Sequence, residues 1–129
     1  MQILQRVTEA ILKIRNYSDA SEINCGDCWI WAVAAHECLP GSKIYEAVNR
    51  YRVGHAFIEY EGKYYDSESL EGVDDWKDLR YYVLNRQMNF YYPVEVKEKN
   101  HFFVQGWSED FAKDSTDITN ITQEVGISV

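Results

Sequence analysis

Residues 28–39 are apolar on almost every side, and this stretch limits what the chain can fold into. It reads Cys-Trp-Ile-Trp-Ala-Val-Ala-Ala-His-Glu-Cys-Leu, with Asp27 before it as a predicted N-cap and Pro40-Gly41 after it as a stop signal. A helix without a polar face has to run through the interior of a water-soluble domain. We therefore expect residues 28–39 to form a helix at the centre of the core.

Length and charge exclude several classes of protein. The 129 residues, 46% of them hydrophobic and 15% aromatic, suit one domain with its own core. With 13 Lys and Arg against 21 Asp and Glu, the net charge of −8 opposes nucleic acid as a partner. No apolar run is long enough for a membrane span, and the first residues lack the apolar h-region expected of a signal peptide. Three cysteines, an odd count, favour free thiols in a reducing, cytoplasmic compartment.

The remaining elements are predicted from periodicity and turn signals. Apolar residues at helical spacing predict an amphipathic helix over 2–16. After it we expect a polar loop over 17–27, a helix over 42–51 and strands over 53–60 and 63–67. Further on we expect a helix from Asp74 or Asp75 through Val83 and one or two strands within 86–97. Residues 100–113 fit either a helix or a short strand. The expected domain spans 1–113, and the polar tail 114–129 is expected to be loosely held.

The turn at Glu61-Gly62 fixes the register of the predicted hairpin. With a two-residue loop, Phe57 lies opposite Asp66, so His55 and Asp66 are diagonal neighbours on one face of the sheet. Diagonal Cβ atoms are about 7–8 Å apart, a separation that an imidazole and a carboxylate can bridge. The hairpin therefore predicts a His55–Asp66 pair.

Cys28 is the candidate nucleophile. It ends a Gly/Asp loop and opens the apolar helix, where unpaired backbone N–H groups and the helix dipole favour a thiolate. His55 would accept and return the thiol proton, and Asp66 would orient the imidazole. The Cys28 backbone N–H and the Asn24 side chain are the candidates for holding an oxyanion.

The stretch Cys25-Gly26-Asp27-Cys28-Trp29 resembles the Cys-Gly-x-Cys-Trp active-site motif of papain-like cysteine proteases. In that family the second Cys attacks the substrate and the Trp covers the site, which implies these roles for Cys28 and Trp29. The resemblance spans five residues, and the chain departs from it in having Glu22 where the family has a Gln. The family's His also lies much farther along the chain. The order Cys28, His55, Asp66 is instead similar to the transglutaminase-like branch of the superfamily.

The resemblance implies an α+β domain in which a central helix packs on a small antiparallel sheet. It also implies a cysteine peptidase or amidase that acts on an amide bond of a protein or peptide and needs no metal or organic cofactor. Gly54 would let the substrate backbone approach. Two alternatives remain open: a transglutaminase or deamidase activity, and a catalytically inactive papain-like binding module.

Each candidate residue also has a structural interpretation. Cys28 could be a buried core thiol, and His55 or Asp66 ordinary hairpin residues. Cys25 and Cys28 could form half of a zinc site with His36 and Cys38, but His36 would lie about 12 Å from Cys28 along the helix. His101 is the reserve base should the hairpin geometry fail.

Overall fold

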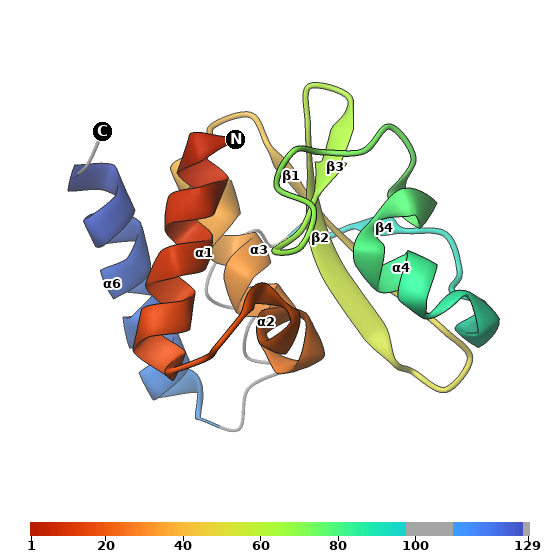
Figure 1. Ribbon diagram of the computed structural model, residues 1–129, viewed down its shortest axis with the longest axis horizontal. Helices are drawn as coiled ribbons and strands as arrows, with labels where there is room; N and C mark the ends of the chain where they lie inside the picture. Colours follow the sequence, from red (N-terminus) through yellow and green to blue (C-terminus); the bar gives the residue numbers. More distant parts are fainter. Residues whose placement is uncertain (98–109, 128–129) are drawn as a thin grey trace.

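A four-stranded antiparallel sheet with the strand order β3-β2-β1-β4 separates two layers of helices (Figure 1). The computed structural model describes residues 1–97 and 110–127. The strands are β1 (Lys43–Val48), β2 (Gly54–Tyr60), β3 (Lys63–Tyr65) and β4 (Val94–Glu95). The helices are α1 (Gln2–Arg15), α2 (Ala20–Gly26), α3 (Cys28–Cys38), α4 (Arg80–Leu84) and α6 (Phe111–Ile127), with 3-10 turns η1 (Trp76–Asp78) and η2 (Arg86–Met88). The expected α+β class is confirmed.

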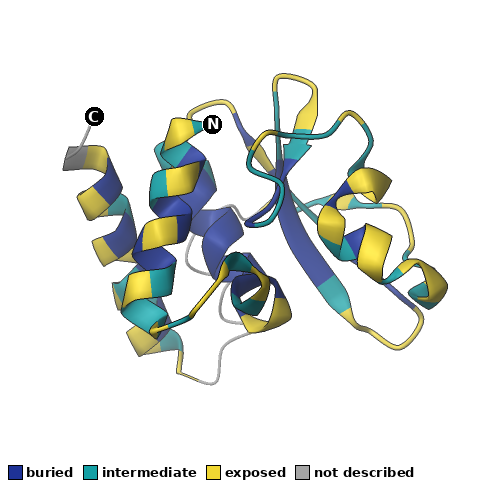
Figure 2. Cartoon of the chain, in the orientation of Figure 1, coloured by how far each residue is buried: buried dark blue, intermediate teal, exposed yellow. Residues whose placement is uncertain are grey.

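Helix α3 lies at the centre of the core, as its sequence predicts. All of residues 28–35 are buried, and α3 packs against α1 and α6 on one side and against β2 on the other (Figure 2). The Asp27 side chain does not cap α3. It accepts a hydrogen bond of 2.5 Å from the Tyr17 hydroxyl and lies 3.6 Å from Nε of Arg15. The acid therefore ties the start of α3 to α1 and the segment that follows it.

The predicted hairpin is observed in the predicted register. Tyr60 pairs with Lys63 and Ile58 with Tyr65 across the turn. Glu61 and Gly62 both have positive φ, 51° and 84°, which is what a tight two-residue hairpin turn requires. The register argument for His55 and Asp66 thus rests on a turn that is present.

The helix expected over 42–51 is wrong, because these residues contain strand β1. Strand β1 pairs with β2 along its whole length, from Lys43 opposite Glu59 to Val48 opposite Gly54. Tyr45 also stacks on Phe57 across the two strands, with ring centroids 6.1 Å apart. Pairing with a neighbouring strand and cross-strand packing override the helical spacing of the apolar residues.

The loop expected over 17–27 is also wrong, since it contains the short helix α2. Asp19 caps this helix by accepting a hydrogen bond of 3.0 Å from the Ser21 backbone N–H. Glu22, three residues further on, accepts one of 3.3 Å from Ser18 N–H. The two acids resemble a capping box in sequence, but their hydrogen bonds go to the second helical residue, Ser21, and to the residue before the N-cap, Ser18.

Residues 114–127 are not a loosely held tail, because they belong to α6. Ile118, Ile121 and Val125 recur at helical spacing and are buried against α1 and α3. The helix also begins before residue 114, so it crosses the expected domain boundary. Of the ambiguous stretch 100–113, residues 100–109 lie outside the described part of the chain.

The segments between β3 and β4 agree in part with expectation. Asp75 caps η1 through a 3.0 Å bond from Lys77 N–H, but extended backbone at Leu79 separates η1 from α4. The expected single helix is therefore two short ones. Within 86–97, the described structure has η2 followed by the short edge strand β4, which directly follows Pro93 and pairs with β1.

Candidate active site

Three predicted site residues meet at one end of the sheet, where α3 begins, β2 begins and β3 has just ended. Along β2, Ala56 and Ile58 belong to the core around α3, whereas Phe57 packs in the cluster beneath α4. His55 lies on the α4 side, in contact with the ring of Phe57. Cys28, the first residue of α3, comes from the other layer and interacts with His55 through its side chain.

His55 and Asp66 form the predicted pair. The distance from His55 Nε2 to Asp66 Oδ2 is 3.0 Å, and the two side chains are 0% and 1% exposed. The second carboxylate oxygen, Oδ1, accepts a 3.0 Å hydrogen bond from the Glu68 backbone N–H. The carboxylate is therefore held in place and in turn fixes the orientation of the imidazole.

The other imidazole nitrogen, His55 Nδ1, is buried and has no hydrogen-bond partner within the described residues. Burial lowers the pKa of His55, but the hydrogen bond to Asp66 and interactions with the Cys28 thiol and with the Asp66 charge outweigh it, and the pKa rises to about 9. Since Asp66 occupies Nε2, Nδ1 is the nitrogen left to interact with the thiol. The favoured form of His55 at neutral pH is thus an imidazolium.

Aromatic rings enclose the imidazole. Tyr81 of α4 stacks on it with centroids 4.0 Å apart and an angle of 11° between the rings. Tyr82 meets it edge-on at 5.4 Å, and Phe57 stacks on it at 6.2 Å. The sequence does not single out Tyr81; its only signal is the Tyr81-Tyr82 pair, which suits a cleft wall as well as a packed face.

A pocket of about 360 Å³ opens beside Cys28. The predicted residues Asn24, Trp29 and Gly54 all line it together with Cys28, whereas His55 and Asp66 are not among the lining residues. The other lining residues come from α2, the strand junctions and the α4 region: Ser21, Cys25, Gly26, Val53, Glu68, Tyr81, Leu84 and Asn85. Cys28 itself is 5% exposed, so the thiol is reached through this pocket.

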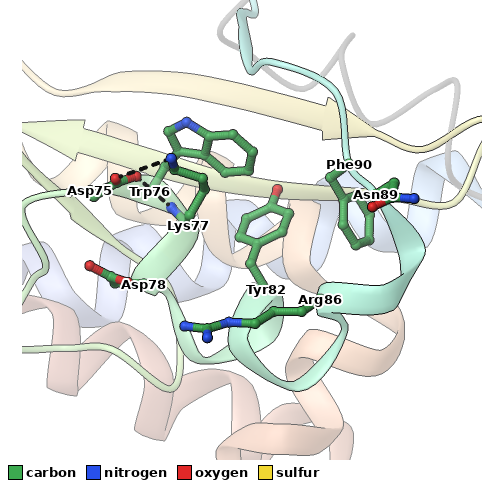
Figure 3. A pocket seen from close by; sticks show the side chains of 8 residues that line it. All are labelled: Asp75, Trp76, Lys77, Asp78, Tyr82, Arg86, Asn89 and Phe90. Atoms are coloured by element: carbon green, nitrogen blue, oxygen red, sulfur yellow. Dashed lines mark hydrogen bonds and ion pairs between the residues drawn. The ribbon is translucent and has the colours of Figure 1, made fainter.

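A second pocket, of about 420 Å³, has Tyr82 in its wall (Figure 3). Its walls include Trp76 and Phe90, whose rings meet Tyr82 edge-on at 4.8 and 4.9 Å. Charged side chains line it as well: Asp75, Lys77, Asp78 and Arg86. None of the predicted site residues reaches this pocket.

The zinc alternative finds no support in the side-chain arrangement. Within residues 1–97 and 110–127, no group of three or more His, Cys, Asp or Glu side chains could hold a metal ion. His36 Nδ1 pairs with the Ser42 hydroxyl at 3.1 Å, and burial raises the pKa of the Cys38 thiol to about 11. His101, the reserve base, lies outside the described residues.

No protein-family model, no curated protein and no solved structure matches this chain. None of the helices in the described residues has the length and apolarity that crossing a membrane requires.

Proposed function

We propose that this chain is a cysteine enzyme that cleaves an amide bond of a protein or peptide through an acyl-enzyme intermediate. The observation that carries the proposal is His55, a buried imidazole with Asp66 on Nε2 and Nδ1 left for the thiol that opens α3. The Cys-Gly-x-Cys-Trp stretch supports it by resemblance to papain-like proteases. A papain-like relationship of the fold is part of the same proposal.

In the first half of the reaction, the Cys28 thiolate attacks the carbonyl carbon and a sulfur–carbon bond forms. The carbonyl oxygen becomes an oxyanion, which the Cys28 backbone N–H and the Asn24 amide would hold. The carbon–nitrogen bond then breaks as His55 Nδ1–H gives its proton to the leaving amine. Asp66 keeps Nε2 protonated throughout, so Nδ1 is the nitrogen that transfers protons.

In the second half, water attacks the thioester while the now neutral His55 Nδ1 accepts its proton. The carbon–sulfur bond breaks, the acid product leaves, and thiolate and imidazolium are restored. If an amine replaces the water, the same steps give the transglutaminase-type outcome. The pocket beside Cys28 has a volume of about 360 Å³, and the acceptor is decided by which nucleophile follows the acyl group into it.

Selective alkylation of Cys28 tests the proposal without a known substrate. We expect iodoacetamide at pH 6 to label Cys28 at least about tenfold faster than the exposed Cys25, although Cys28 is buried. Exchanging His55 for Gln should abolish this preference, because the neutral amide cannot stabilise a thiolate. The readout is peptide mass spectrometry of each cysteine over pH 5–9.

Two comparisons make the result specific. His36→Gln, which changes a histidine paired with Ser42, should leave the labelling unchanged. Near-UV circular dichroism establishes that each variant is folded. Labelling of Cys28 no faster than Cys25, or only after unfolding, would contradict the proposal and favour a binding module.

A further inference from the structure

The segment Asp66-Ser67-Glu68, directly after β3, holds both sides of the candidate active site. Asp66 binds the imidazole of His55. The next two side chains turn to α2 instead, where both bind the amide of Asn24. One short segment therefore connects the proton-transfer group to a residue that lines the pocket beside Cys28.

The partners of Asn24 fix which way its amide points. Its Nδ2 donates a 3.0 Å hydrogen bond to Glu68 Oε1, and a carboxylate can only accept. Its Oδ1 lies 3.0 Å from the Ser67 hydroxyl, whose single hydrogen is shared with the Ala20 carbonyl oxygen, also at 3.0 Å. A flipped amide would set its carbonyl oxygen against the Glu68 carboxylate, so this orientation is strongly preferred.

An amide nitrogen carries two N–H groups, and Glu68 uses one of them. Asn24 is 6% exposed, so few solvent molecules can accept a hydrogen bond from its second N–H. Asn24 lines the same pocket as Cys28, four residues before it in the chain. We infer that Glu68 is a positioning residue: it aims the second N–H of Asn24 at the oxyanion formed on the Cys28 adduct.

This inference rests on the proposed function and adds a residue to it. Glu68 lines the same pocket, but both of its carboxylate oxygens are engaged, Oε1 by Asn24 and Oε2 by Arg80, and we infer that it acts through Asn24. Its other oxygen, Oε2, lies 3.2 Å from Nε of Arg80, whose side chain is 61% exposed. An ion pair with an exposed partner contributes little to stability. The role that we infer for Glu68 in the reaction therefore depends on its hydrogen bond to Asn24.

Two reactions of the same thiol separate positioning from structure. Alkylation by iodoacetamide forms no oxyanion and needs only the thiolate. Acylation by p-nitrophenyl acetate forms an oxyanion and releases one p-nitrophenolate per active site in a burst. We expect Glu68→Ala to slow the burst by about 10- to 100-fold and to leave the alkylation rate of Cys28 within about twofold, because only a transition-state contact is lost.

Matched variants sharpen this result. Glu68→Gln keeps an oxygen that accepts from Asn24 and should restore the burst to within about threefold of the wild type. Arg80→Ala removes the ion pair but keeps the hydrogen bond, and should have little effect. In an Asn24→Ala background, Glu68→Ala should add no further loss, because the two residues act as one unit. Glu68→Leu, which keeps the side-chain volume, replaces the alanine variant if that one does not fold.

Four results would overturn the inference. They are an unchanged burst in Glu68→Ala, equal losses of acylation and alkylation, an effect of Arg80→Ala as large as that of Glu68→Ala, and an additive loss in the double variant. A wild-type protein that gives no burst at all contradicts the proposed function itself. The two failures are therefore distinguishable.

Discussion

At the scale of single residues, the site depends on one histidine whose two nitrogens have different surroundings. Nε2 faces a fixed carboxylate, and Nδ1 is left to interact with the Cys28 thiol. Tyr81 covers the face of the ring, so that no part of His55 is exposed to solvent. Such a group keeps its proton at neutral pH and can still give it up to a partner at Nδ1.

Exchanging Asp66 for Asn should lower the pKa of His55 from its value of about 9. Burial would continue to favour the neutral imidazole, while the negative charge that opposes burial is gone. Iodoacetate, an anion attracted by the imidazolium, reports the change: its reaction with Cys28 slows as His55 loses its proton. In the plot of this reaction rate against pH, the fall on the alkaline side should move to lower pH by roughly 1 unit or more.

Asp74→Asn is the matched control, since Asp74 has a side chain that is 88% exposed and pairs with Lys63 at the surface. In this variant, the rate of the iodoacetate reaction should fall at the same alkaline pH as in the wild type. An unmoved fall in rate in Asp66→Asn would show that the carboxylate does not set the protonation of His55.

At the scale of elements, the sequence predicts those parts whose signal is local. The hairpin follows from Glu61-Gly62, whose two positive φ angles are a property of the turn itself, and α3 follows from an uninterrupted apolar run. The register predicts that Asp66 lies on the His55 side of the sheet, although β3 ends at Tyr65, short of the expected strand over 63–67, and Asp66 is held just beyond it by the Glu68 N–H. Because both signals are local, the pairing of these two side chains can be derived from the sequence.

Other elements could not be derived, because their identity depends on partners distant in sequence. Ile44 and Val48 are spaced as on a helix, and only pairing with β2 makes them a strand. The burial of α6 depends on α1 and α3, and its polar residues conceal the stripe of Ile118, Ile121 and Val125. Tyr81 comes over His55 only because α4 packs on the sheet.

Helix α6 should contribute substantially to stability. Ile118 is 0% exposed, so Ile118→Ala should lower the free energy of unfolding by about 2–5 kcal/mol through lost burial and the cavity left behind. Urea unfolding followed by circular dichroism measures it. Thr119→Ala, at the exposed neighbouring position, should change stability by no more than about 0.5 kcal/mol. Equal effects of the two variants would mean that α6 is not part of the core.

At the scale of the whole molecule, the site is assembled from segments that lie far apart in the sequence. Asn24 and Cys28 come from the helical layer, His55 and Asp66 from the hairpin, and Tyr81 from the layer on the other side of the sheet (Figure 1). The ionised pair proposed for catalysis thus exists only in the folded chain. Its protonation is therefore linked to global stability.

The pH dependence of unfolding tests that linkage. His55 has a pKa of about 9 in the folded protein against the ordinary value of 6.5, so between these values this one residue binds more protons in the folded state than in the unfolded state. The contribution to stability is complete below pH 6.5 and is lost as the pH rises through about 9. It amounts to about 3 kcal/mol. Urea unfolding of Cys28→Ser at several pH values between 6 and 10 should show a decline of this sign, because no thiolate is present whose missing proton offsets the proton on His55. Asp66→Asn in the same background should show a smaller decline, because the folded-state pKa of His55 is lower. Parallel profiles for the two proteins would exclude His55 as the group responsible.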